Sequence, residues 1–226
     1  MRLADRFRDL RSTVSRRARI NRISPSLQWV HYFAYRWVTR RLPSGSVESA
    51  VGALGKGRRL LEVRSANDPA VASALREEDC ALGIVFGGDV LTRPTLEALD
   101  VPLFNIHLSD PAFVRGLPPV FWEILGGHDS IRMTLHVLAP QLDAGPIVTQ
   151  KDVPIAWQRT LGGTLLRTTE RCAGEVTSLL ADGIRAILDG SVEPRPIGPG
   201  TLRTTPTIRQ ILQARRICRK RARESR

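Results

Sequence analysis

The chain has little cysteine and no long apolar run. Its 226 residues contain three cysteines, in neither a Cys-x-x-Cys nor a zinc-finger spacing. This predicts free thiols in a reducing, cytoplasmic setting. No stretch approaches the roughly 18 to 20 apolar residues of a membrane span, and no apolar core of a signal peptide follows Met1. The length of the chain predicts one α/β domain, and the absence of a long apolar run predicts no transmembrane segment.

Two common active-site motifs are also missing. The sequence contains no Gly-x-Ser-x-Gly nucleophile elbow, so a Ser-His-Asp hydrolase is not supported. Gly87 and Gly88 follow an apolar segment but lack the Gly-x-Gly-x-x-Gly spacing of a phosphate-binding loop. We interpret Gly87 and Gly88 as the place where the backbone closely approaches a ring-shaped ligand.

Acidic residues are scarce at both ends of the chain. Residues 1–43 hold 11 Arg and 2 Asp, a net charge of +9, and residues 203–226 hold 8 Arg, 1 Lys and 1 Glu, a net charge of +8. Subtracting both from the total of +12 leaves −5 for residues 44–202. We therefore predict a basic helical N-terminal arm (1–43), an α/β domain (44–202) and a basic helical tail (203–226).

Each arm allows two interpretations. Trp29, Phe33 and Trp37 recur every four residues, which predicts an apolar stripe packed on the body; a membrane-touching helix is the alternative. The tail begins with an amphipathic stretch, 208–214, and then becomes arginine-rich. We interpret it as a solvated, fraying end, and contact with RNA or another acidic partner is the alternative.

The region between the arms alternates strands with helices. This alternation predicts an α/β fold whose mostly parallel, doubly wound, Rossmann-like sheet is covered by helices on both faces. Ligands of such sheets lie beyond the carboxyl ends of the strands. The expected strands are 59–63, 81–86, 102–108, 132–138 and 147–155, and the expected helices are 70–78, 92–99, 120–125 and 160–188.

Three polar side chains follow strands in this pattern. Asn105 and His107 are two residues apart on the strand 102–108, so their side chains share one face. Asp143 lies in a Pro/Gly-punctuated loop after the strand 132–138. An amide, an imidazole and a carboxylate suit acyl transfer, in which an oxyanion is stabilised and an amine loses a proton. The alternative is a capped strand end with a structural His–Asp pair.

We do not expect a metal site among these groups. His107, His128, His136 and Asp143 are the candidate ligands. Strand alternation places His136 on the face of Thr134 and gives it no shared ligand spacing with His107.

The order of several motifs resembles a known family over roughly residues 60–190. Phe104–Ser109, Arg115-Gly116, Trp122 and Leu142–Gln150 together resemble the signature of the formyltetrahydrofolate-dependent formyltransferases. That family includes glycinamide ribonucleotide formyltransferase, the N-terminal domain of methionyl-tRNA formyltransferase and amino-sugar formyltransferases. Gly145–Gln150 is most similar to the glycinamide ribonucleotide branch, and Thr204–Leu212 resembles the end of the polysaccharide-associated amino-sugar branch.

The resemblance implies N10-formyltetrahydrofolate as co-substrate, no metal, and a role for each catalytic residue. Asn105 would donate a hydrogen bond to the formyl oxygen. His107, held protonated or as a donor by Asp143, would stabilise the oxyanion. Asp143, directly or through a water, would remove a proton from the amine. The folate would contact Phe86, Gly87, Gly88, Val90, Leu91, Leu138, Gln141, Leu142 and Asp143, and a substrate loop would contain Ser109, Arg115 and Gly116. We interpret Arg115-Gly116 as a turn that orders this loop, with a substrate clamp as the alternative.

Two features depart from the family pattern. Asp110-Pro111 replaces the usual apolar pair after the His-x-Ser motif, and no apolar first strand is evident in residues 1–43. The sequence predicts transfer of a formyl group to a primary amine of a small molecule, with an amino-sugar nucleotide as the first candidate. The alternatives are a glycinamide ribonucleotide-type acceptor, methionyl-tRNA (for whose additional C-terminal domain the chain leaves little room), or a non-catalytic module that binds through its basic arms.

Overall fold

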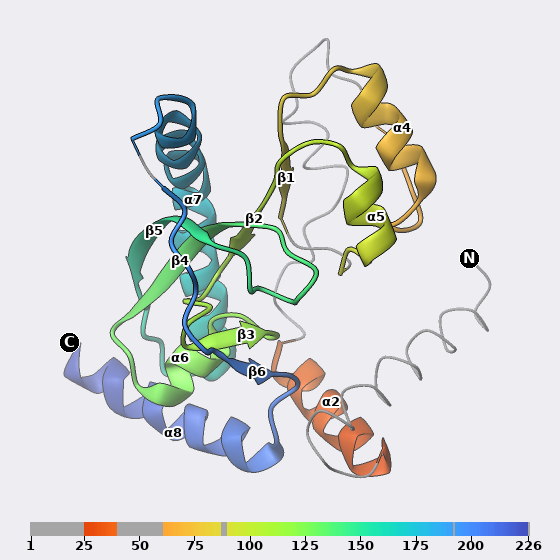
Figure 1. Ribbon diagram of the computed structural model, residues 1–226. Coiled ribbons are helices and arrows are strands. Elements are labelled where there is room, and N and C mark those ends of the chain that lie inside the picture. Colours follow the sequence, from red (N-terminus) through yellow and green to blue (C-terminus); the bar gives the residue numbers. More distant parts are fainter. Residues whose placement is uncertain (1–24, 40–60, 87–89, 192, 226) are drawn as a thin grey trace.

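A computed structural model describes residues 25–39, 61–86, 90–191 and 193–225 (Figure 1). The predictions for residues 1–24 and 40–60, and for Gly87 and Gly88, lie outside these ranges. Among the described residues, no helix is both long and apolar enough to cross a membrane.

The centre of the molecule is a four-stranded sheet of order β1-β2-β4-β5. It contains β1 (Gly83–Val85), β2 (Leu103–His107), β4 (Ser130–Val137) and β5 (Ile147–Pro154). β1 and β2 are parallel, whereas β2 with β4 and β4 with β5 are antiparallel.

The α/β class, with a central sheet and packed helices, is confirmed. The expectation of a mostly parallel sheet does not hold for the described strands. The loop 138–146 between β4 and β5 is too short for the crossover that parallel neighbours require, so the chain returns antiparallel. Of the expected strand 59–63, residues 61–63 are described and are not in a strand.

Six helices surround the sheet in the described part of the chain. Figure 1 shows α4 and α5 near β1, α7 alongside β4 and β5, and α8 beneath α6. Their bounds are α2 (Pro25–Thr39), α4 (Pro69–Glu77), α5 (Arg93–Ala98), α6 (Phe121–Gly126), α7 (Leu161–Leu188) and α8 (Ile208–Glu224). The Asp68 side chain caps α4 by accepting from the N–H of Ala70, and Pro69 occupies the first turn.

α7 continues through four glycines that weaken its intrinsic preference for a helix. Gly183 has a packing role, because a Cβ there would lie 2.3 Å from Cδ2 of Leu135 on β4. The missing side chain lets α7 approach the sheet closely.

The tail is not a solvated, fraying end, so that interpretation is wrong. α8 begins with a capping box formed by Thr207 and Gln210. Four of its side chains are buried, and the first three of them belong to the main core: Ile211, Ala214, Cys218 and Ala222. The apolar face of α8 is thus part of the body of the protein.

The described side chains through which helix α2 packs on the body lie outside the predicted stripe. Gln28 and His31 are buried, and the ring of Tyr35 meets that of Phe121 edge to face. Burial lowers the pKa of His31. Phe33, from the predicted stripe, is exposed. The side chains of Trp29 and Trp37 lie outside the described part of the structure.

A second, two-stranded sheet lies beside the first. It pairs β3 (Val114–Gly116) with β6 (Thr201–Arg203) in parallel. Leu117 N–H also donates to the carbonyl oxygen of Arg203. This pairing joins a segment near the middle of the chain to one close to its C-terminal helix.

Candidate active site

The end of β2 presents two polar side chains towards β4. Asn105 lies directly opposite His136, and His107 lies opposite Thr134, in the antiparallel register of β2 and β4. Directly opposed residues share a face of the sheet and are close neighbours. The register therefore places His136 beside Asn105, which alternation along one strand could not reveal.

The loop 138–146 brings Asp143 to the same place. Asp143 has φ of 48°, a left-handed conformation that aspartate tolerates better than most residues. Gly145 allows the loop to lie against the end of β4, since a Cβ there would be 1.8 Å from the carbonyl oxygen of Val137. The local sequence of this loop thus positions the carboxylate over β2.

The Asp143 carboxylate is the centre of a polar cluster, defined here as Asn105, His107, His136 and Asp143. Its Oδ2 accepts from the N–H of Gly116 at 2.8 Å, and its Oδ1 accepts from Asn105 Nδ2 at 3.4 Å. His107 Nδ1 is 3.7 Å from Oδ2, and His136 Nε2 is 3.8 Å from Oδ1. The three side chains predicted to converge are brought together. His107, His136 and Asp143 are each less than 10% exposed.

Hydrogen bonds to backbone carbonyls identify the protonated nitrogens. A carbonyl oxygen only accepts, so His136 Nδ1 donates to the oxygen of Val137 at 2.9 Å. Burial is the main effect on the pKa of His136 and lowers it, which favours a neutral ring. The bare Nε2 of His136 then accepts from Asn105 Nδ2 at 3.1 Å.

His107 is oriented in a similar way. Its Nε2 donates to the carbonyl oxygen of Val114 at 3.2 Å, which turns Nδ1 towards Asp143. The Asn105 amide directs both of its N–H groups at His136 and Asp143. Donation from Asn105 to a substrate oxygen therefore requires release of one bond, and the longer bond, to Asp143, is the easier to exchange.

A cavity of about 270 Å³ opens beside the cluster. Asn105, His107 and Asp143 line it, as do five predicted folate contacts: Phe86, Val90, Leu91, Leu138 and Leu142. Phe86 and Val90 are 55% and 48% exposed, so this wall presents apolar surface to solvent. A flat, mostly apolar ligand would cover that surface. Gln141 is exposed and does not line the cavity.

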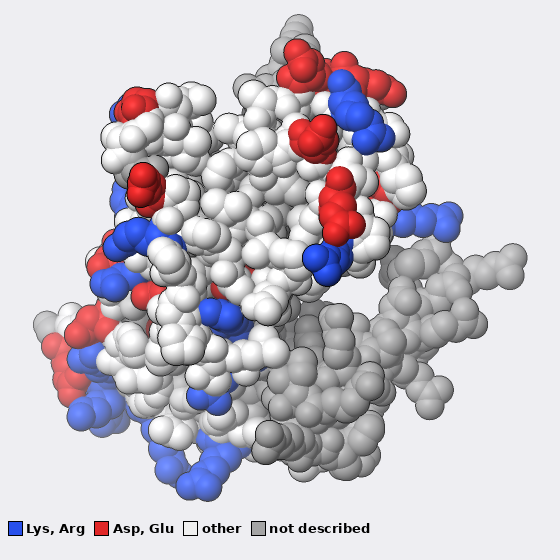
Figure 2. Space-filling model, in the orientation of Figure 1, with Lys and Arg blue, Asp and Glu red and all other residues white. Residues whose placement is uncertain are grey.

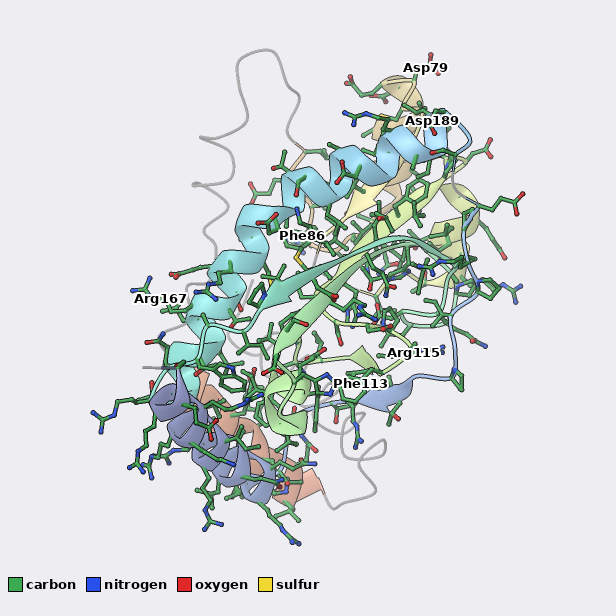
Figure 3. The ribbon with its side chains drawn as sticks, turned by 90° about the vertical axis from the view of Figure 1, so that its left-hand side faces the viewer. Asp79, Phe86, Phe113, Arg115, Arg167 and Asp189 are labelled. Carbon is green, nitrogen blue, oxygen red and sulfur yellow. The ribbon has the colours of Figure 1, made fainter. Side chains whose placement is uncertain are left out.

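The predicted substrate loop divides into one cavity residue and two that order the chain. Gly116 lines the cavity and donates to Asp143. Arg115, labelled in Figure 3, donates through Nη2 to the carbonyl oxygen of Gly198 at 2.7 Å and through Nε to that of Pro111 at 3.3 Å. Ser109 is buried, and its hydroxyl donates to Glu123 Oε1. Arg115 and Ser109 do not line the cavity.

Glu123 is a buried carboxyl group that the sequence pattern did not reveal. It lies on α6 and is 3% exposed, and its Oε2 has no hydrogen-bond partner among the described residues. Burial raises the pKa of Glu123, outweighing the opposing effect of the Ser109 hydrogen bond. The neutral acid is therefore favoured at Glu123. Ser109, whose hydroxyl donates to Glu123, lies two residues after His107 along the chain.

No group of three or more His, Cys, Asp or Glu side chains lies close enough together to hold an ion among the residues described. The clustered groups instead bond to one another and to backbone atoms.

Comparison with known proteins places the site within a matched region. Residues 41–175, which include the whole polar cluster, match the family model described as "Formyl transferase". Methionyl-tRNA formyltransferase of Thermobifida fusca (strain YX) is 34% identical over 174 residues, which cover 75% of this chain and 53% of the relative. The enzyme of the same name from Chloroflexus aggregans (strain MD-66 / DSM 9485) is 31% identical over 158 residues, covering 70% and 49%.

The fold is also similar to a solved structure. A crystallised variant of HypX from Aquifex aeolicus has a TM-score of 0.51 with 16% sequence identity, over 70% of this chain and 30% of that one. The chain spans about half the length of the curated relatives it matches. Because the family model covers more than half of the sequence, the chain belongs to the formyl transferase family.

Proposed function

We propose that the protein transfers a formyl group from N10-formyltetrahydrofolate to a primary amine. The observation that carries this proposal is the convergence of Asn105, His107 and Asp143 at one side of an apolar cavity. Membership of the formyl transferase family supports the same chemistry.

The co-substrate supplies an activated formyl carbonyl group. Asn105 donates from Nδ2 to the carbonyl oxygen after releasing its bond to Asp143. His107 releases the bond from its Nε2–H to the carbonyl oxygen of Val114 and turns that N–H towards the formyl oxygen as negative charge develops there. Preorganised donors of this kind each contribute about 3 kcal/mol of barrier lowering.

In this proposal, Asp143 takes the proton that the amine loses as its nitrogen bonds to the formyl carbon. The N–H of Gly116 at 2.8 Å and the left-handed backbone at residue 143 hold its carboxylate in position. The departing N10 nitrogen of the folate takes up the proton that Asp143 accepted from the amine, so protons and charge balance over the reaction.

The apolar wall supports folate as the donor. Phe86, Val90 and Leu142 are exposed at the cavity and offer a surface on which a ring system packs. The carboxylate and imidazoles lie at one side of this wall, where the formyl group of such a ligand would meet the amine.

For the acceptor, we propose an amino-sugar nucleotide. The support is the resemblance of Thr204–Leu212 to the amino-sugar branch, together with the position of β6 immediately before it. β6 pairs with β3 through Gly116, which contacts Asp143. Methionyl-tRNA is the second candidate, because the curated relatives named above carry that activity in their names.

Two measurements test these proposals in sequence. Calorimetry with 5-formyltetrahydrofolate tests the donor site. Formyl transfer is then followed by mass spectrometry of a panel containing amino-sugar nucleotides, glycinamide ribonucleotide and methionyl-tRNA. Addition of one formyl group to an amino-sugar nucleotide is the expected result. Binding of the folate without transfer to any amine would favour a non-catalytic module, and absence of both would overturn the proposal.

A further inference from the structure

The outer face of α8 carries a row of arginines. Because α8 is anchored through Ile211, Ala214 and Cys218, its opposite face is fixed towards solvent. Figure 2 shows Lys and Arg side chains gathered along the lower edge of the molecule, where α8 runs. We define the arginine row as the four exposed side chains that helical spacing places on one side: Arg209, Arg216, Arg219 and Arg223.

The basic side chains of α8 differ in whether they contact an acidic partner. Arg221 turns towards the body, where it donates to Asp129 and to the carbonyl oxygen of Gly127 and lies over the ring of Trp157. Lys220 is 3.8 Å from Glu224 on the surface. Within the described residues, the four side chains of the arginine row have no acidic partner. No acidic side chain among the described residues therefore offsets their mutual repulsion.

The row is narrow and straight. At about 1.5 Å per residue, Arg209 and Arg223 are roughly 21 Å apart along the helix axis. Residues 44–202, by contrast, carry a net charge of −5. An extended polyanion following α8 would contact all four arginines and keep away from the acidic body.

We propose that the arginine row binds the phosphodiester backbone of single-stranded RNA. The guanidinium group pairs with a phosphate through two parallel hydrogen bonds and also stacks on bases, which the lysine ammonium does not do. A bilayer surface fits less well. An amphipathic helix binds lipid through its apolar face, and that face of α8 is buried in the core. This inference does not depend on the proposed transferase activity.

The test is fluorescence anisotropy with a labelled 20-nucleotide oligouridine and the full chain, without folate or acceptor. In 20 mM salt we expect a Kd on the order of 10⁻⁵ M. Each phosphate contact contributes about −0.7 to the slope of log K against log salt concentration, so four contacts give a slope of about −3. The variant Arg216→Gln/Arg219→Gln/Arg223→Gln should bind at least about 30-fold more weakly, with a slope of about −1.

A charge-matched control separates the row from net charge. Arg167→Gln/Arg171→Gln/Arg185→Gln removes three exposed arginines from α7, of which Arg167 points away from the body in Figure 3. This control should bind oligouridine within about threefold of the wild type, because it leaves the row's phosphate contacts unchanged. Circular dichroism establishes that both variants fold.

Two outcomes would overturn the inference. In one, the α8 variant and the wild type bind oligouridine equally. In the other, the wild type binds vesicles of phosphatidylglycerol and phosphatidylcholine but not oligouridine, which would assign the row to a membrane surface.

Discussion

The polar cluster around Asp143 and the arginine row of α8 use charge in opposite ways. In the cluster, the buried carboxylate is held by a backbone N–H and by side chains from β2 and β4. In the row, exposed guanidinium groups face solvent without acidic partners among the described residues. Electrostatic interactions are strong in a low-dielectric interior and are screened at the surface. The first arrangement suits directed chemistry, and the second suits loose, salt-sensitive attraction.

The largest effect is expected from removing the charge at the centre of the cluster. Asp143→Asn should lower kcat by about 10²- to 10⁴-fold, because the amine loses its proton acceptor and His107 loses its orienting group. Steady-state kinetics on the acceptor found in the panel measures this. Asp152→Asn is the control, since Asp152 is an exposed partner of Arg132 and does not line the cavity. Equal turnover in both variants would remove Asp143 from the mechanism.

The next largest effect is expected on the free energy of unfolding, when a buried residue of α8 is compared with an exposed one. Ile211 is buried in the core and its neighbour Leu212 is 47% exposed. Ile211→Ala should lower the free energy of unfolding by about 2–5 kcal/mol, through lost burial and the cavity left behind. Leu212→Ala should change it by less than about 0.5 kcal/mol. Urea unfolding measures both, and similar losses would mean that α8 is not docked through Ile211.

A smaller effect is expected on the pH dependence of stability, for which the buried Glu123 is compared with the more exposed Glu175. Burial raises the pKa of Glu123, so its contribution to stability is complete at low pH and is lost as the pH rises through the folded-state pKa. Glu123→Gln should make stability less sensitive to rising pH, as measured by thermal unfolding across a pH series.

Glu175 provides the opposite case for the same pH series. Its pKa is lowered first by the hydrogen bond from Lys151, so its contribution is present at neutral pH and is lost on acidification. Glu175→Gln should therefore flatten the acid side of the profile and leave the alkaline side unchanged. If both variants alter the same side, the assigned protonation of Glu123 is wrong.

The smallest effect is expected in the arginine row. Arg216→Gln should change the free energy of unfolding by no more than about 0.5 kcal/mol, because the side chain has no partner among the described residues to lose. Arg221→Gln should cost more, since it removes the bonds to Asp129 and Gly127. Chemical denaturation distinguishes the two, and a large loss for Arg216→Gln would reveal a structural role for the row.

Local periodicity accounts for the part of the site that the sequence predicted. Asn105 and His107 are two residues apart on one strand, and the Gly/Pro pattern around Asp143 indicates a tight loop. His136 was not predicted as a member of the cluster, because its position opposite Asn105 depends on the register between two strands. Glu123 was missed for a similar reason, since its contact with Ser109 joins a helix to a loop.

The fold shows the same division between local and long-range information. The local sequence pattern predicted α4, α5, α6 and α7 within a few residues. The antiparallel direction of β4 and β5 follows from the short loop 138–146. The expected strands 132–138 and 147–155 already left no helix between them, but the general strand-helix alternation was given more weight. The docking of α8 was missed because Ala214, Cys218 and Ala222 are small and only weakly hydrophobic, whereas the charges around them dominate the composition.

The parallel pairing of β3 with β6 has a practical consequence for protein engineering. The region similar to the family model ends at residue 175. Gly116, however, pairs with Arg203 across the β3–β6 ladder, and its N–H holds the carboxylate of Asp143. A truncation designed from similarity alone would discard that pairing together with α8. A shortened version made for expression should therefore keep residues 201–203. Without them, we expect the central sheet to form but the carboxylate of Asp143 to be held less firmly.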